Sequence, residues 1–248
     1  MKVVLIGDIH GRSNWKRIVR EHKDADEFVF FGDYFDPYEY RPFHEQKRNF
    51  ESIFDFALDS DKKVVMLLGN HDLHYYCDVE KCSRFDMSNA GEIQKLLEDA
   101  MLHMDVAYQF DNVLCTHAGL SPKWLDKWIG KWDASNVADK VTALHDMNTT
   151  PFGFYENDFS GFGDDPSQGP MWIRPRSLIM ANKEDNRLDS LVQVFGHSQL
   201  EDIIESHNVL LNEFDGKFFM VDALEHGGYI VYQDSVFTPY ILDKKQVD

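Results

Sequence analysis

Short apolar runs that end at a glycine recur along the first third of the chain. They cover residues 2–6, 27–31 and 64–68, and they are followed by Gly7, Gly32 and Gly69. Runs of this length, rich in β-branched and aromatic residues, are typical of buried strands. Between them, apolar positions at helical spacing predict helices over 14–21, with Ser13 as the N-cap, and over 44–58. This order predicts parallel strand–helix–strand units and an α/β fold.

The rest of the chain continues the alternation of helices and strands. Helical spacing predicts helices over 91–102, 122–129 and 134–147, and apolar runs predict strands over 106–110, 112–115 and 191–195. From residue 203 to 242, short apolar segments alternate with turn signals such as Asp215-Gly216 and Asp234-Ser235, which predicts antiparallel hairpins. The segment 149–170 has no periodicity; its aromatic residues favour an ordered lid over ordinary packing beneath a surface loop.

Length and cysteine content bound the class of protein. A chain of 248 residues with 43% hydrophobic residues can form one globular domain over 1–248. No apolar run approaches the ~20 residues that span a bilayer, and the N-terminus has no signal-peptide pattern. Three cysteines are an odd, sparse set, so we expect a cytoplasmic protein in which Cys77 and Cys82 are unpaired thiols.

The formal net charge of −18 restricts the partners. Proteins bind duplex nucleic acid largely by neutralising phosphates with Lys and Arg, so stable duplex binding is not expected. The same charge repels phosphorylated substrates at long range, unless bound cations reverse the sign of the field locally.

Residue types that bind metal ions follow the ends of five predicted strands. They are Asp8 and His10, Asp33, Asn70 and His71, His117, and His197. Sites in open α/β sheets form outside the carboxyl ends of the strands, so these side chains are expected to converge. Carboxylate, imidazole and amide ligands suit divalent ions such as Mn, Fe, Zn or Co. The set exceeds one tetrahedral site and fits two ions about 3.5–4 Å apart that share a carboxylate.

The loops at these strand ends form an ordered series of motifs. They read Gly-Asp-Ile-His-Gly, Gly-Asp-Tyr-Phe-Asp, Gly-Asn-His-Asp, Thr-His-Ala-Gly-Leu-Ser-Pro and Gly-His. Over about 1–198 this series resembles the calcineurin-like metallophosphoesterases, and within them the phosphoprotein-phosphatase branch with its bacterial and phage relatives. The resemblance implies a two-layer β-sandwich core flanked by α-helices, which carries a dinuclear metal centre.

The resemblance also implies roles for individual residues. Asp8 and His10 would hold the first ion, Asp33 would bridge both ions, and Asn70, His117 and His197 would hold the second. His71 would donate a proton to the leaving group, Asp36 would orient its imidazole, and Arg174 would bind the phosphate. A water shared by two cations ionises near neutral pH, which implies a metal-bridging hydroxide as the nucleophile.

Three positions depart from the family pattern. The protein phosphatases have Arg after Gly-Asp-x-x-Asp, whereas this chain has Pro37-Tyr38, so one phosphate-binding cation is missing. Arg12, Arg41 and Arg176 are candidates to replace it, and each is otherwise an ordinary surface residue. Asp72 stands where Glu is usual. The last motif, Gly-His-Ser-Gln, lacks a second His, which favours phosphatases over nucleases.

The expected function is hydrolysis of phosphomonoesters, with Ser/Thr phosphoproteins among the candidate substrates, by a dinuclear centre. Manganese is the favoured ion, with Fe, Zn, Co or Ni as alternatives. The first alternative function is a nucleotide pyrophosphohydrolase or phosphodiesterase, similar to the diadenosine-tetraphosphate hydrolases. The second is a non-catalytic binding scaffold that has retained the fold.

Overall fold

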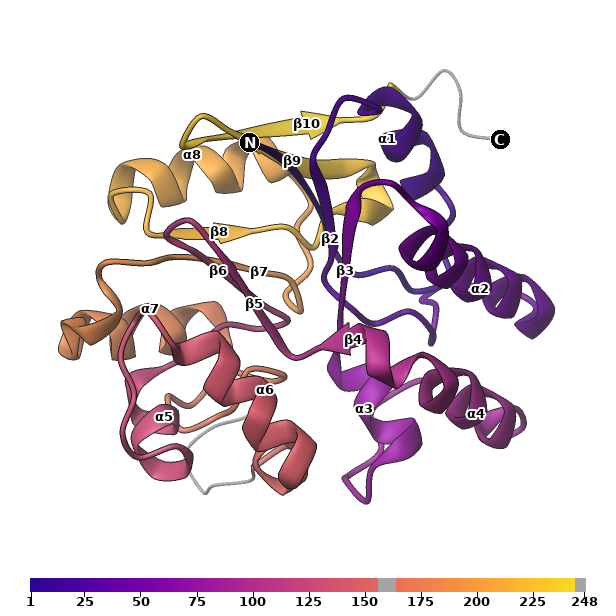
Figure 1. Cartoon of the computed structure of the whole chain (residues 1–248), viewed down its shortest axis with the longest axis horizontal. Coiled ribbons are helices and arrows are strands. Elements are labelled where there is room, and N and C mark those ends of the chain that lie inside the picture. The colour runs from indigo at the N-terminus through magenta and orange to yellow at the C-terminus, as the bar shows by residue number, and fades with distance from the viewer. Residues whose placement is uncertain (156–163, 244–248) are drawn as a thin grey trace.

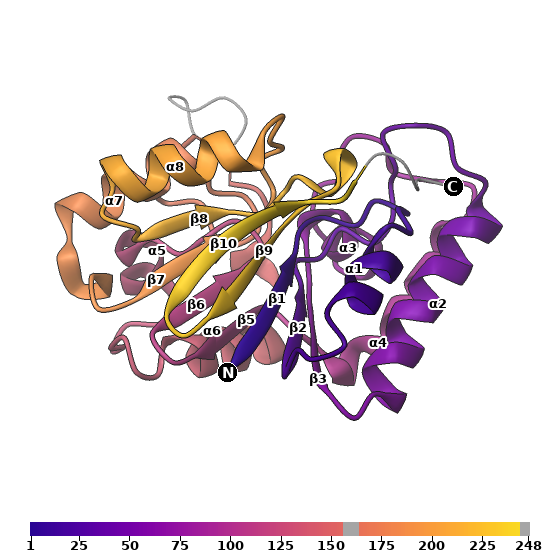
Figure 2. The ribbon, with the colours of Figure 1, turned by 90° about the horizontal axis from the view of Figure 1, so that it is seen from above.

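Two β-sheets lie face to face, and helices cover their outer sides (Figures 1 and 2). The computed structural model describes residues 1–155 and 164–243. The strand order is β10-β9-β1-β2-β3-β4 in the first sheet and β5-β6-β7-β8 in the second. The predicted α/β sandwich flanked by helices is therefore confirmed.

The first sheet contains the parallel units predicted from the N-terminal third. Strands β1 (Lys2–Ile6), β2 (Glu27–Phe30) and β3 (Lys63–Leu67) pair in parallel, with Val4 opposite Phe28 and Phe28 opposite Val64. Helices α1 (Trp15–Glu21) and α2 (Phe43–Asp59) form the two crossovers. The sheet is completed by β4 (Met104–Asp105) at one edge and by β9 (Gly228–Gln233) with β10 (Val236–Ile241) at the other.

The second sheet begins with an antiparallel pair and continues in parallel. Strand β5 (Ala107–Phe110) pairs antiparallel with β6 (Val113–Thr116), and β7 (Val192–Phe195) and β8 (Phe218–Met220) then add in parallel. Strands β6, β7 and β8 therefore end at the same edge of the second sheet.

Strands that are buried on both faces explain the continuous apolar runs in the sequence. In β1, Val3 and Leu5 point into the core between the sheets, whereas Val4 and Ile6 belong to the core beneath the helices. Alternate residues of a strand face opposite sides, so burial of both faces needs apolar residues at every position.

The helices predicted after residue 90 are present with small shifts in their ends. They are α4 (Ala90–Ala100), α5 (Pro122–Trp128) and α6 (Val137–Met147). Two further helices, α3 (Asn70–Tyr76) and α7 (Pro175–Glu184), were not predicted. Single 3₁₀ turns occur at η1 (Met101–His103), η2 (Thr150–Phe152), η3 (Asn186–Leu188) and η4 (Leu224–His226).

The prediction of hairpins from residue 203 onward is only half correct. Residues Ile203–Glu213 form helix α8, because the Asp202 carboxylate caps its first turn by accepting from the amides of Ile204 and Glu205. The hairpin β9–β10 is present, and its turn residues Asp234 and Ser235 have φ values of 53° and 64°.

The N-cap predicted for α1 is wrong by one residue. Asn14, not Ser13, precedes the helix, and its side chain donates to the carbonyl of Leu224 instead of capping the helix. This bond ties α1 to the segment that follows β8.

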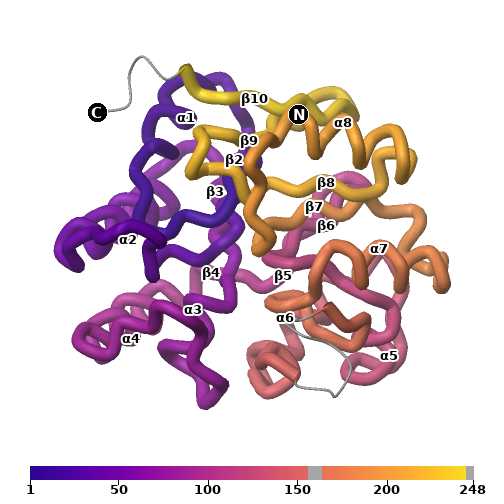
Figure 3. The backbone as a smooth tube through the Cα atoms, turned by 180° about the vertical axis from the view of Figure 1, so that it is seen from behind, coloured from indigo at the N-terminus to yellow at the C-terminus, as the bar shows by residue number. Residues whose placement is uncertain are grey.

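The two sheets lie beside each other (Figure 3), and the loops that follow β1 and β2 contact those that follow β6 and β7: His197 donates from its amide to the Asp8 carboxylate, and His117 bonds the Phe31 carbonyl. None of the helices in the described ranges is both long and apolar enough to cross a bilayer. In the segment 149–170, the central part with Phe159 and Phe162 lies outside the described residues. Phe152 is fully buried against Trp124, so this part of the segment is ordinary core packing.

Candidate metal centre

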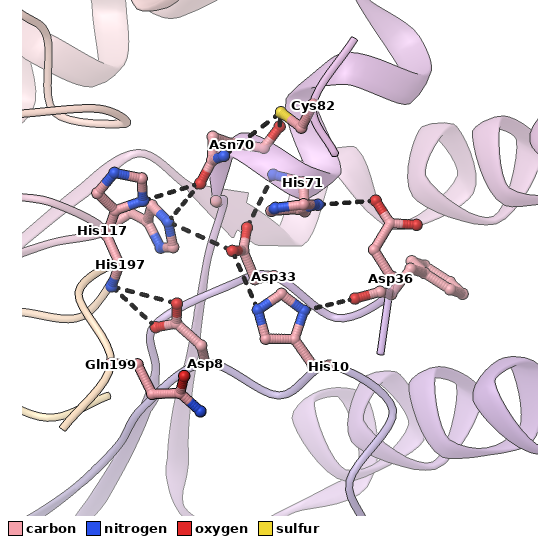
Figure 4. A network of polar contacts seen from close by, with 12 residues as sticks. Asp8, His10, Asp33, Asp36, Asn70, His71, Cys82, His117, His197 and Gln199 are labelled. Carbon is pink, nitrogen blue, oxygen red and sulfur yellow. Dashed lines mark hydrogen bonds and ion pairs between the residues drawn. The ribbon is translucent and has the colours of Figure 1, made fainter. Parts of the chain in front are cut away.

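The predicted metal ligands come together at this junction. Each follows a strand end: Asp8 and His10 after β1, Asp33 after β2, Asn70 after β3, His117 after β6 and His197 after β7 (Figure 4). His10, Asp33 and His197 have positive φ values of 42°, 53° and 62°. Such conformations cost about 1–3 kcal/mol each and persist only where surrounding contacts enforce them.

Asp8, His10 and Asp33 form the first group of ligands. Their donor atoms all lie within 4.8 Å of one another, and each residue is buried. His10 donates from Nδ1 to the carbonyl of Phe35 at 2.8 Å, which leaves Nε2 facing Asp33 Oδ2 at 3.5 Å. A backbone acceptor that fixes the ring in this way is usual for a histidine that binds a metal ion through its other nitrogen.

Asn70, His117 and His197 form the second group. The Asn70 amide oxygen lies 2.9 Å from His117 Nε2 and 3.0 Å from His197 Nδ1. His117 Nδ1 bonds the carbonyl of Phe31 at 2.7 Å, and its Nε2 faces Asp33 Oδ2 at 3.6 Å. One oxygen of Asp33 thus lies between His10 and His117, as a bridging carboxylate requires.

The tautomer of His117 indicates that the second group is incomplete without a ligand. Its Nδ1 donates to the Phe31 carbonyl, so Nε2 of the neutral ring carries a lone pair, yet this atom faces the Asn70 amide oxygen at 2.9 Å. Two acceptors this close repel each other unless a cation lies between them. Together with the carboxylate donors beside it, this contact makes the site fit divalent cations.

The pKa values of the two carboxylates at the centre, Asp33 and Asp8, are shifted in opposite directions. Burial would raise the pKa of Asp33, but the imidazoles of His117, His71 and His10 outweigh burial and hold that pKa below its usual value. Burial, with the negative charge of Asp222 and then of Asp33, raises the pKa of Asp8 well above normal. Bound cations would relieve this repulsion among buried acids.

Asp222 is a part of this environment that the sequence analysis missed. It follows β8, it is buried beside Asp8, and burial raises its pKa to about 7 although Arg12 opposes the shift. The available signal was one more apolar strand, Phe218–Met220, that leads into an acidic residue.

Two glycines of the motifs are required by close approach of the ligands. A Cβ on Gly196 would lie 2.1 Å from Asp8 Oδ1, and a Cβ on Gly69 would lie 2.1 Å from Asp33 Oδ1. Any side chain at either position would push Asp8 or Asp33, carboxylates of the candidate site, out of place. These glycines therefore serve the site as well as the turn.

Asp72 fastens two of the loops to each other. Its carboxylate accepts from the amides of Gly69, Asp33 and Tyr34 at 2.9, 2.7 and 2.9 Å. The side chain thereby caps the first turn of α3 and positions the backbone of Asp33. The replacement of Glu by Asp is accommodated, because the shorter side chain makes all three bonds.

His71 and Asp36 form the pair that the sequence predicted. His71 Nδ1 lies 2.8 Å from Asp36 Oδ2, so this nitrogen carries the proton and Nε2 is directed away from Asp36. His74 Nε2 is also 2.9 Å from Asp36 Oδ2, and the Tyr75 hydroxyl donates to Oδ1. Burial raises the pKa of Asp36, but these partners outweigh it and lower the pKa below normal.

Arg174 lies beside the second group of ligands. Its guanidinium donates to the His197 carbonyl at 3.3 Å and to Ser198 Oγ at 3.2 Å. Burial lowers its pKa, an effect opposed by Tyr38, Asp222 and Asp8 among others. Arg174 therefore lies at the edge of the candidate centre, next to His197.

A second cation at the site, Arg84, was missed by the sequence analysis. It lies in the irregular segment after α3, where its guanidinium donates from Nε to the Asp36 carbonyl at 3.0 Å and lies over the Tyr38 ring at 3.8 Å from the centroid. Its Nη2 is 3.3 Å from His71 Nε2. By contrast, Arg176 is exposed on α7, and Arg12 is paired with Glu225 at 2.7 Å.

The segment that carries Arg84 is anchored by several contacts to α3. Cys82 donates from its amide to His74 Nδ1 at 3.0 Å, and its sulfur lies 3.4 Å from the amide nitrogen of Asn70. Phe85 stacks on Tyr75 with ring centroids 4.7 Å apart. Cys77, Cys82 and Cys115 are all free thiols, as predicted for the first two. These contacts hold Arg84 next to His71.

The sequence of the chain matches the family model of the calcineurin-like phosphoesterases over residues 1–200. The chain belongs to this family. A curated relative is the symmetrical bis(5′-nucleosyl)-tetraphosphatase of Nitrosospira multiformis, with 29% identity over an alignment of 86 positions, which covers 29% of this chain and 29% of that protein. The match therefore covers less than a third of that relative.

Two solved structures share the fold of this calcineurin-like phosphoesterase. One is a cold-active protein-tyrosine phosphatase of a psychrophilic Shewanella species, with a TM-score of 0.64 and 19% identity over 96% of this chain and 77% of that chain. The other is a metallophosphoesterase of Sphaerobacter thermophilus, with a TM-score of 0.51 and 11% identity over 98% of this chain and 89% of that chain. At these identities the likeness concerns the fold.

Proposed function

We propose that this protein hydrolyses phosphomonoesters at a centre of two divalent cations, with manganese as the favoured ion. The observation that carries the proposal is the position of one Asp33 oxygen between His10 and His117, flanked by Asp8 on one side and by Asn70 and His197 on the other. When bound, two such ions lower the pKa of a water molecule and offset the charge of the phosphoryl oxygens.

The residues beside the metal ligands supply the other requirements of the reaction. His71, oriented by Asp36, would donate a proton from Nε2 to the leaving oxygen, and such a donor typically accelerates a reaction by about 10²–10⁴. Arg174 would hold the phosphoryl group from the side of His197. The burial of Asp8 and Asp33 keeps bulk water from screening their charges.

Arg84 would bind the phosphoryl group from the opposite side. In the neutral form of His71, Nε2 accepts from Arg84, whereas a protonated Nε2 cannot. Phosphoryl oxygens placed next to His71 would then take over the guanidinium as acceptors. Arg84 would thus replace the cation that Pro37-Tyr38 lacks, with the Tyr38 ring as its platform.

Removal of the Arg84 guanidinium is expected to lower kcat/KM for p-nitrophenyl phosphate by about 10–100-fold, which corresponds to one charge-assisted hydrogen bond. Arg84→Lys should recover only part of this loss, because an ammonium cannot make the forked contact. Steady-state kinetics of Arg84→Ala, Arg84→Lys and Arg176→Ala provide the test. A larger loss in Arg176→Ala than in Arg84→Ala would contradict the assignment.

Hydrolysis of p-nitrophenyl phosphate with and without manganese tests the proposed function itself. We expect turnover with added manganese, loss of turnover after treatment with a chelator, and recovery when the metal is returned. Activity that survives chelation with metal content near zero would contradict the proposal. So would an inactive protein with both ions bound, a result that would support the scaffold alternative.

A second candidate is hydrolysis of a nucleotide anhydride. It is favoured by the sequence match to a protein named as a symmetrical bis(5′-nucleosyl)-tetraphosphatase. Comparing the turnover of diadenosine tetraphosphate, a cyclic nucleotide and a phosphoserine peptide on the same preparation separates the two candidates. The substrate with the highest kcat/KM identifies the function.

A further inference from the structure

A basic cavity adjoins the metal centre on the side of His10. It has a volume of about 430 Å³, and His10 and Tyr38 form part of its wall. Its basic lining residues come from the start and the length of α1 and from the loop before α2: Arg12, Lys16, Arg17, Arg20 and Arg41. The acidic lining residues are Glu39 and Glu225.

The charge of this cavity is opposite to that of the whole protein. The chain carries a formal net charge of −18, yet five basic residues face two acidic ones here. Arg12 pairs with Glu225 at 2.7 Å and Arg17 with Glu21 at 2.6 Å. Within residues 1–155 and 164–243, the other three basic residues have no carboxylate partner. A concave surface with uncompensated positive charge concentrates anions.

The cavity shares the wall residue His10 with the candidate metal centre. The Tyr38 ring lies 4.9 Å from the His10 ring, between centroids, and the Arg12 guanidinium lies 5.6 Å from the Tyr38 centroid. The His10 ring is in turn 5.3 Å from the ring of His71. His10 is therefore in contact both with a wall residue of the cavity and with His71.

Arg41 is the basic residue best placed to bind an anion in this cavity. Its Cδ would lie 3.3 Å from a Cβ at position 11, so the side chain passes over Gly11, the residue after His10. Its guanidinium has no hydrogen-bond or ion-pair partner among the described residues. Gly11 has a φ of 71° and no side chain, and this allows Arg41 to approach the metal-binding loop.

We propose that this cavity binds a second phosphate group of the substrate, next to the phosphoryl group that is hydrolysed. The substrate class is therefore a small molecule with at least two phosphate groups, either joined as an anhydride or carried as separate esters. This inference rests on the proposed dinuclear centre, which both candidate functions share, and it specifies the substrate that the centre takes. The cations of the cavity also offset the long-range repulsion that the net charge imposes on such a substrate.

Binding of two non-hydrolysable phosphonates to the manganese-loaded protein tests this inference. Methylenediphosphonate carries two phosphonate groups and methylphosphonate carries one, and titration calorimetry at a fixed concentration of free manganese measures both. We expect the diphosphonate to have a dissociation constant at least about tenfold lower. Arg41→Ala should reduce this ratio to about threefold or less and leave methylphosphonate binding unchanged.

Arg48→Ala is the matched control, because Arg48 lies on α2, outside the cavity, and among the described residues its guanidinium donates only to the His44 carbonyl of its own helix. It should keep the wild-type ratio. Equal affinity of the wild type for both phosphonates, or the same loss in Arg48→Ala as in Arg41→Ala, would overturn the inference. These results do not depend on turnover, so hydrolysis of p-nitrophenyl phosphate tests the proposed function separately.

Measuring kcat/KM for two kinds of substrate decides whether the second phosphate is joined as an anhydride or carried as a separate ester. Diadenosine tetraphosphate and ADP present an anhydride, whereas fructose 1,6-bisphosphate presents two separate esters. The class whose kcat/KM falls about tenfold or more in Arg41→Ala, with p-nitrophenyl phosphate turnover within about twofold of wild type, is the class that the cavity recognises. If no substrate of either class responds to Arg41→Ala, the proposed subsite is wrong.

Discussion

His71→Asn is expected to lower kcat for phenyl phosphate by about 10²–10⁴ while both metal ions stay bound. The loss follows from removing the proton donor, since phenolate is a poor leaving group unless it is protonated as the bond breaks. p-Nitrophenolate is a better leaving group, so kcat for p-nitrophenyl phosphate should fall much less. Steady-state kinetics on both substrates, with metal analysis of the same preparations, measure the effect.

His74→Asn is the matched control for this variant. His74 is buried and approaches the same oxygen of Asp36 at 2.9 Å, but its other nitrogen accepts from the Cys82 amide and does not face the metal ligands. His74→Asn should lower kcat for both substrates to a similar extent, and by less than His71→Asn lowers kcat for phenyl phosphate. If His71→Asn empties the metal site, or lowers kcat for both substrates by the same factor, His71 is not the proton donor.

The strands and the convergence of the candidate metal ligands were predictable from the sequence because both follow a local rule. A strand buried on both faces leaves a continuous apolar run, and the loop after it must begin where the run ends. Asp8, Asp33 and Asn70 could therefore be assigned to one sheet edge without coordinates. The bridging position of Asp33 was implied only by the family resemblance, and the distances now support it.

Helix α3 was missed because the site itself is built from it. Its buried residues include Asn70, His71, Asp72 and His74, so the face that packs inward is polar and no apolar periodicity marks the helix. The charges of this face are compensated by Asp33, Asp36 and backbone amides. Sequence patterns that locate helices by their apolar faces fail at such a segment.

Helix α8 was misread for a different reason. Ile203, His207 and Leu210 are buried, but the apolar residues Ile204, Val209 and Leu211 are 43%, 43% and 47% exposed. Because apolar residues lie on both the buried and the exposed face of α8, their spacing does not show a clear helical period. The turn signals in this part of the chain then favoured hairpins. Arg84 could not have been found at all from pattern, because it reaches His71 from an irregular segment with a φ of 66°.

Asp33→Asn is expected to lose bound metal, in contrast to His71→Asn. Asp33 is the carboxylate shared by the two groups of ligands, and an amide removes its charge and one of its acceptor oxygens. Metal content should fall from about two ions per chain to less than one, and turnover should fall with it by at least about 10³-fold. Elemental analysis after dialysis and steady-state kinetics measure both quantities.

Thermal unfolding distinguishes lost metal binding from a general loss of stability. Ions that bind only the folded state raise Tm by mass action, so manganese should raise the Tm of the wild type and have little effect on Asp33→Asn. Asp55→Asn, the same chemical change on the exposed face of α2, should retain the full response. A manganese-dependent rise in Tm in Asp33→Asn equal to that of the wild type would show that the two groups of ligands do not depend on this carboxylate.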